Sequence, residues 1–162
     1  MSIDLVPFRE TPYNLQFVFA GKMFEWSYNS SFAAGNTDWQ LKTPQNKTLH
    51  LTNRTMLTSS TSLEFQLWES PIVAVQGTSA LSIFNVSRVS VSTSGTKIYT
   101  NPTIGGLGTN IEDIFLIAGD AYIQKTPEII LKSDTDYHIR VINTGAGNRT
   151  LNFQFVWYEP SN

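Results

Sequence analysis

The sequence has no cysteine, only two histidines and few charged residues. Asp, Glu, Lys and Arg together make up 15% of the 162 residues. The absence of cysteine excludes disulfide bonds and every metal site that needs a thiolate ligand. The formal net charge of −2 provides neither the basic excess that attracts nucleic acid nor an acidic tail for cationic partners. We therefore expect no nucleic-acid partner.

Long apolar runs are also missing. No stretch approaches the ~20 consecutive apolar residues that a membrane-spanning helix requires, so we expect no membrane partner. The first ten residues, MSIDLVPFRE, have neither the basic start nor the continuous apolar core of a secretion signal. We therefore expect synthesis in a cytoplasm.

A sustained helical pattern is a third absence. Short apolar or alternating runs recur instead, separated by Gly, Pro, Asn and Ser, and such spacing predicts a β-sandwich or barrel. The runs lie at 15–19, 23–28, 48–57, 62–68, 72–75, 86–91, 97–100 and 128–132. A run at 114–117, closed by Gly119, fits a strand better than a helix. The polar stretches 29–45 and 92–110 are predicted to connect strands across the ends of the sandwich.

The end of the chain has the clearest pattern. Apolar and polar residues alternate over 136–141 and 151–157, on either side of a loop, 143–148, that contains two glycines. Alternation places every second side chain on one face, so each run predicts a strand buried on one side. The length suits one core, and no repeat of fixed period is visible. The sequence therefore predicts an all-β protein, an antiparallel β-sandwich.

Residue types that perform chemistry are present, but not in the spacing that a site requires. His50 and His138 each lie between apolar neighbours in an alternating run, so we expect both to point away from the core without binding zinc. The run Asp134-Thr135-Asp136 lacks the remaining oxygen ligands of a calcium loop and is predicted to be a turn.

Two further motifs are incomplete. The neighbouring carboxylates Glu112 and Asp113 would face opposite sides of a strand, which predicts solvated charges rather than a catalytic pair. The run Gly105-Gly106-Leu107-Gly108 lacks the Lys-Ser/Thr pair of a phosphate-binding loop and is predicted to be a mobile loop. We therefore expect no enzymatic activity, no metal and no cofactor.

Aromatic residues are the first candidates for binding a partner. Phe24, Trp26 and Tyr28 share one strand face, which either fills the core or stacks on sugars or on another protein. Trp39 lies among polar neighbours and is predicted to be a partner-binding residue.

The N-terminal segment is the second candidate. Residues 1–20 are predicted to form an extended arm, followed by one domain over 21–162. Pro7 and Pro12 remove backbone donors that a central strand needs, yet the segment is too apolar to remain in water. The large apolar residues predicted to bind a partner are Leu5, Val6, Phe8 and Tyr13.

One succession of short motifs resembles a known family. Its elements are Trp68-Glu69-Ser70-Pro71, Gly77-Thr78, Asn85-Val86-Ser87-Arg88, Tyr99-Thr100-Asn101-Pro102 and the closing runs 137–143 and 153–159. This order of strand ends and turns, which covers roughly 48–159, resembles the small jelly-roll decoration (cement) proteins of tailed bacteriophages. The resemblance implies a jelly-roll sandwich and a virion structural protein without catalysis, located on the outer capsid surface.

The resemblance also implies a mechanism and partners. A decoration protein binds the assembled capsid and bridges neighbouring capsomers, which stabilises the lattice by mass action. The implied partners are the major capsid protein of a phage and further copies of the chain, in a trimer or a dimer. The main alternative is a carbohydrate-binding jelly-roll module of a tail fibre or lectin, binding through Trp26 or Trp39. A hydrolase is disfavoured because no acid, base and nucleophile converge.

Overall fold

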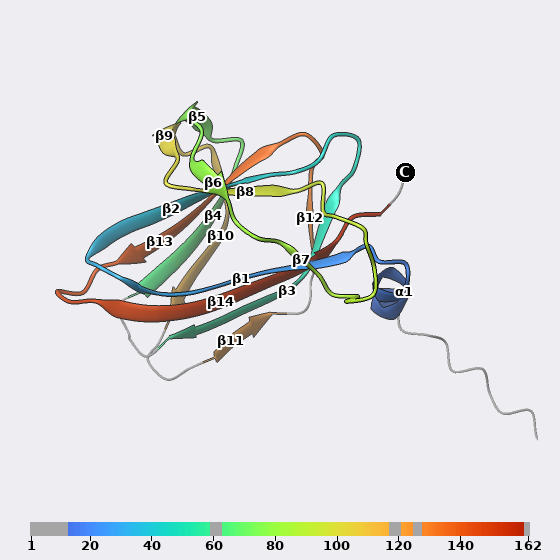
Figure 1. Cartoon of the computed structure of the whole chain (residues 1–162). Helices are drawn as coiled ribbons and strands as arrows, with labels where there is room; N and C mark the ends of the chain where they lie inside the picture. Colours follow the sequence, from blue (N-terminus) through green and yellow to red (C-terminus); the bar gives the residue numbers. More distant parts are fainter. Residues whose placement is uncertain (1–12, 59–62, 117–120, 125–127, 161–162) are drawn as a thin grey trace, which may run out of the picture.

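The computed structural model describes residues 13–58, 63–116, 121–124 and 128–160. Helix α1 (Tyr13–Phe19) is followed almost entirely by strands (Figure 1). One sheet, sheet A, contains β1 (Met23–Phe32), β3 (Leu49–Thr58), β7 (Phe84–Asn85), β11 (Ala121–Gln124), β12 (Ile129–Leu131) and β14 (Arg149–Tyr158). The other, sheet B, contains β2 (Gly35–Lys42), β4 (Leu63–Glu69), β6 (Thr78–Ala80), β8 (Lys97–Thr100), β10 (Thr109–Leu116) and β13 (Asp136–Asn143). Strands β5 (Ile72–Val75) and β9 (Thr103–Gly106) form a separate ribbon.

Eight of these strands have jelly-roll topology. Their order is β1-β14-β3-β11 in sheet A and β2-β13-β4-β10 in sheet B, and neighbours are antiparallel. Each strand of sheet A is joined through one short connection to the strand at the same position in sheet B. This is the arrangement of a ribbon wound twice around the sandwich. The predicted all-β, antiparallel jelly-roll sandwich is confirmed.

The core between the sheets is largely aromatic. Strand β14 buries Phe153, Phe155 and Trp157 completely, as its alternation predicts. The ring of Trp26 meets Phe153 and Phe155 edge-on, with centroids 4.9 and 5.6 Å apart. Edge-to-face pairs of this kind add about 0.5–1.5 kcal/mol each to the burial of apolar area. Trp26 and its neighbour Phe24 therefore fill the domain's own core.

Residues 70–108, between β4 and β10, are an insertion into the eight-stranded frame. The insertion supplies the β5–β9 ribbon and adds β8 and β6 to sheet B beyond β2. It also adds β7 to sheet A beyond β1. Long insertions in a compact domain often contain the residues that bind a partner.

The region before β1 differs from the predicted extended arm. Residues 15–19, predicted as a strand, belong to α1. The helix ends in a Schellman motif: the Lys22 N–H donates to the Phe17 carbonyl and the Gly21 N–H to Val18, with Gly21 at φ +66°. A run of five residues fits the period of a strand as well as that of a helix, and Gly21 is the sequence signal that favours the helix. Residues 1–12 lie outside the described residues.

Two other predicted segments are corrected. The stretch 29–45, predicted as a connection, contains all of β2, an inner strand of sheet B that buries Trp39 and Leu41. The run 86–91 is a loop and not a strand. The stretch 92–110 contains β8, β9 and the start of β10. The strand predicted at 114–117 is confirmed for 114–116, within β10.

Candidate functional site

The predicted partner-binding residues do not form one site. Trp39 is 1% exposed, and its ring meets Trp26, Tyr28 and Phe153 edge-on. Trp39 is therefore a core residue rather than a partner-binding one, because its side chain does not reach the surface. Tyr13 is the first residue of α1. Leu5, Val6 and Phe8 lie outside the described residues.

Exposed apolar side chains are concentrated in the insertion. Those in residues 70–108 are Ile72, Val75, Phe84, Val89 and Val91, and they are between 45% and 97% exposed. Ile72 and Val75 belong to one surface, on the β5–β9 ribbon, and Val89 and Val91 belong to a second one beside α1. Figure 1 shows β5 and β9 well apart from α1. Exposed apolar side chains that lie together in a patch, unlike single ones, mark surfaces that bind something else.

The first surface is the β5–β9 ribbon, which lies beside the ends of β2 and β4 (Figure 1). Ile72 pairs with Gly106 across the ribbon, and its side chain packs against this glycine. A Cβ at Gly106 would lie only 3.2 Å from Ile72 Cδ1. Residues 70–78 and 101–108 contain no charged side chain. The predicted mobile loop at 105–108 is therefore partly strand, and the ribbon presents an uncharged, apolar surface that suits another protein.

The second surface, called the α1 surface, combines α1 with the loop 86–92. Leu15 and Phe19 of α1 are exposed, as are Val89 and Val91 of the loop. The loop contacts the chain just after α1, because its Ser90 lies against Gly21. A Cβ at Gly21 would lie 2.1 Å from Ser90 Oγ.

Both segments of the α1 surface are held in place. The Asn85 amide donates to the carbonyls of Gly21 (2.8 Å) and Ser92 (3.0 Å). Helix α1 docks on sheet A through Phe17, whose ring stacks on Tyr158 at 3.9 Å. The surface is therefore anchored to the frame at the loop and at the helix.

The family-like motifs build the insertion. A Cβ at Gly77 would lie 2.2 Å from the Thr100 carbonyl oxygen, so no other residue fits there without a shift. The Thr100 hydroxyl donates to the Thr78 carbonyl at 2.9 Å, and Ser70 and Asn101 adopt positive φ at the turns. The motifs therefore encode the shape of the insertion rather than a chemical site.

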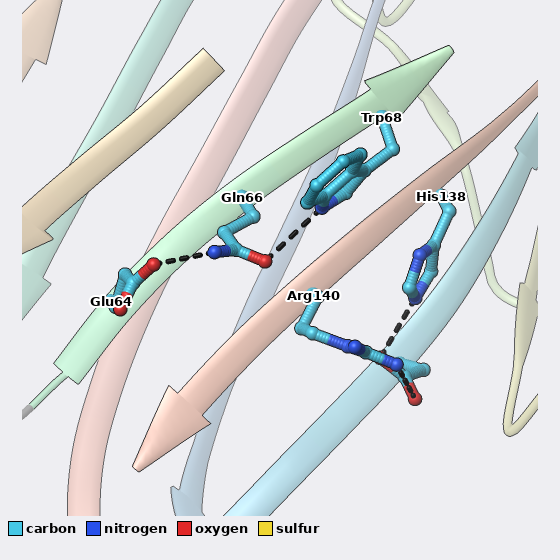
Figure 2. A network of polar contacts seen from close by, with 6 residues as sticks. Glu64, Gln66, Trp68, His138 and Arg140 are labelled. Carbon is cyan, nitrogen blue, oxygen red and sulfur yellow. Dashed lines mark hydrogen bonds and ion pairs between the residues drawn. The ribbon is translucent and has the colours of Figure 1, made fainter. Parts of the chain in front are cut away.

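Hydrogen-bonded polar side chains lie on the outer face of sheet B (Figure 2). Asp38 Oδ1 accepts hydrogen bonds from His138 Nε2 and Arg140 Nε, both at 2.8 Å. Burial alone raises the pKa of Asp38, but the hydrogen bonds and charges of His138 and Arg140 outweigh it, so this pKa is lowered. His138 faces outward as predicted, yet it is fully buried. Its imidazole therefore has no access to a substrate, and it orients Asp38.

A second chain of hydrogen bonds, on the neighbouring strand β4, holds Trp68. The Trp68 indole N–H donates to Gln66 Oε1 at 3.1 Å, and the Gln66 amide donates to Glu64 (Figure 2). A few residues dominate the energetics of protein interfaces, and Trp and Arg are enriched among them. Trp68 and Arg140 are thus better candidates for contacting a partner than Trp39. The sequence indicates this, because Trp68 and Arg140 alternate with the buried residues of β4 and β13 and therefore face outward.

The most enzyme-like group lies next to α1. His50 Nδ1 pairs with Glu128, and His50 Nε2 lies 3.1 Å from Thr48 Oγ1. The Tyr158 hydroxyl lies 2.8 Å from both His50 Nδ1 and Glu128 Oε1. His50 faces outward as predicted. Because Tyr158 also carries the stack with Phe17, we interpret the group as the anchor of α1 on sheet A.

The remaining charged motifs are structural. Asp134 lies in a turn at φ +47°, as predicted. Glu112 is not a solvated charge: its carboxylate lies 3.1 Å from Arg54 Nε across the sandwich, and burial raises its pKa despite the guanidinium. No group of three or more potential ligands among the described residues could hold a metal ion. Within the same residues, no helix is long and apolar enough to cross a membrane.

Comparisons with known proteins do not place the chain in a family. No family model matches it, and no curated protein matches it. A solved structure of infectious bursal disease virus, Gt strain, is similar at 12% identity and a TM-score of 0.20, over 83% of this chain. The chain spans 38% of that viral chain. A similarity this low carries no argument about function.

Proposed function

We propose that this protein is a capsid decoration protein of a tailed bacteriophage, which binds the assembled capsid and bridges neighbouring capsomers. The observation that carries the proposal is the insertion at 70–108. The insertion forms the β5–β9 ribbon and, together with α1, the α1 surface. The jelly roll thus has two separate exposed apolar surfaces. A bridging subunit needs at least two such surfaces, whereas a simple binding module needs one.

The physical basis of stabilisation is mass action. A subunit that binds the assembled lattice but not free capsomers lowers the free energy of the lattice. Self-association as a trimer or dimer multiplies weak contacts into avidity. The family-like motifs support the proposal because they shape the insertion that presents both surfaces. Sugar stacking by Trp26 or Trp39 has no support, since both are 1% exposed.

Co-sedimentation with empty capsids, assembled from the major capsid protein of the same genome, tests the proposal. We expect Ile72→Ser with Val75→Ser, and separately Val89→Ser with Val91→Ser, each to weaken capsid binding at least about tenfold. Leu57→Ser, an exposed apolar residue of β3 outside both surfaces, should bind like the wild type. If the wild-type chain does not sediment with capsids, or if neither double variant weakens binding, the proposal is wrong.

The N-terminal arm provides a second test. Residues 1–12 lead directly into α1, so we propose that Leu5, Val6 and Phe8 extend the contact of the α1 surface with a capsomer or a second copy of the chain. Deleting residues 1–12 should abolish trimerisation or capsid binding, measured by light scattering and by sedimentation. The melting transition should stay nearly unchanged, because the core lies between the sheets. Aggregation or a much earlier melt would show that the segment belongs to the domain's own core.

A further inference from the structure

The outer face of sheet A has a hollow over the middle of β1, β14 and β3. The hollow has a volume of about 290 Å³ and is lined mainly by polar side chains. Ser27 pairs with Gln154 and Asn29 with Asn152 in the β1–β14 register, and Gln154 pairs with Thr55 on β3. The amides and hydroxyls therefore stand in adjacent rows on strands that are fixed by the core beneath them.

Four polar side chains of the hollow are not used by the fold, whereas the Thr55 hydroxyl donates to Asn53 Oδ1. Ser27, Asn29, Asn152 and Gln154 make no side-chain hydrogen bond to another described residue. Each amide offers two N–H donors and one acceptor, and the serine hydroxyl offers both. The backbone groups of these strands already pair with their neighbours, so a ligand here would meet side chains only.

The charge and shape of the hollow select the ligand. Among the described residues, Glu25 is the one carboxylate that lines the hollow and no Lys or Arg lines it, which disfavours phosphate, sulfate and acidic sugars. Leu57, half-exposed beside Asn152, adds one apolar wall. Tyr28 also lines the hollow. Neutral donors and acceptors beside apolar surface match a pyranose ring, whose hydroxyls alternate with C–H faces. The volume is at the small end for a ligand site, which suits one or two sugar units.

We infer that this hollow is a binding site for a neutral glycan. The inference is independent of capsid binding, because the hollow lies on sheet A and shares no lining residue with the β5–β9 ribbon or the α1 surface. It also differs from sugar recognition by Trp26, which is buried on the inner side of β1, or by Trp39, which is buried on β2 of sheet B. On a particle with many copies, a weak site of this kind would gain from multivalency.

A glycan array probed with the purified full-length chain tests the inference, with neutral and acidic glycans side by side. The strongest neutral oligosaccharide is then titrated in solution by calorimetry. The double variant Asn152→Ala with Gln154→Ala should lose at least about tenfold in affinity. Asn36→Ala, an exposed asparagine on the outer face of sheet B, is the matched control and should bind like the wild type.

The outcomes separate the glycan site from the proposed function. The double variant should keep its melting temperature and its capsid binding, since its side chains face away from the core. Binding of no neutral glycan, preference for acidic glycans, or full affinity in the double variant would each overturn the inference. Loss of capsid binding in the double variant would also overturn it, because the face would then be part of the capsid contact.

Discussion

Phe155→Ala should lower the free energy of unfolding by about 3–5 kcal/mol, a large part of the stability of an ordinary domain. Phe155 is fully buried on β14. Its ring meets Trp26 of the same sheet at 5.6 Å and Phe65 of the opposite sheet at 5.8 Å, with planes perpendicular in the second pair. Truncation would thus leave a cavity at the point where the two sheets meet. Chemical denaturation monitored by tryptophan fluorescence measures the effect.

Phe115→Ala is the matched control. Phe115 lies on β10 and is 74% exposed, so its truncation should change the free energy of unfolding by no more than about 0.5 kcal/mol. Equal effects of the two substitutions would contradict the burial pattern of the sandwich. The contrast matters for function as well, because Phe115 faces outward on the same sheet as Trp68 and Arg140.

The sandwich could be predicted because its strongest signal is local. Strand β14 alternates between buried and more exposed residues from Leu151 to Trp157, and alternation follows from the geometry of any strand that is buried on one side. Strand β2 was missed because the first residues of its segment, Asn36 to Asp38, are polar and hide the alternation of Trp39 and Leu41. Pairing with β13, about a hundred residues later, decides its place.

The candidate surfaces could not be predicted for a related reason. The apolar run Ile72–Val75 looks like a core strand in the sequence, and only the topology shows that it pairs with β9 outside both sheets. Val89 and Val91 look like part of a strand, yet the hydrogen bonds of Asn85 hold that segment as a loop. The burial of Glu112 could not be predicted either, because its ion pair with Arg54 joins opposite sheets. The ribbon, the loop and the ion pair all depend on contacts between residues that are distant in the sequence, which local patterns do not contain.

Glu159 links the insertion to the end of β14. Its buried carboxylate accepts hydrogen bonds from the Gly95 N–H (2.9 Å), the Thr96 N–H and hydroxyl (3.2 and 2.8 Å), the Ser94 hydroxyl and the Trp157 indole (3.2 Å). Burial alone raises the pKa of Glu159, but these hydrogen bonds outweigh it, and its pKa is lowered. The carboxylate therefore holds the returning part of the insertion, just before β8, against the core.

Glu159→Gln should lower the free energy of unfolding by about 3 kcal/mol at neutral pH, because the amide nitrogen would face donors that need an acceptor. Since the folded-state pKa lies below the unfolded value, the carboxylate contributes its stability above the unfolded pKa of about 4.3 and loses it as the pH falls through the folded pKa. Denaturation curves of both proteins between neutral and strongly acidic pH measure this.

The difference between the two proteins isolates Glu159. The lowered pKa of Asp38 and the raised pKa of Glu112 act in both proteins, so their contributions cancel in the comparison. We expect the stability gap to be widest at neutral pH and to narrow in acid. Glu25→Gln, a partly exposed carboxylate on β1, should show no such gap. A gap that stays constant with pH would mean that the five donors do not stabilise the charge of Glu159. A narrowing gap would show that protonation removes the contribution of Glu159 to stability. The proposed capsid binding through the β5–β9 ribbon should then weaken over the same pH range, because Glu159 holds the insertion that carries the ribbon.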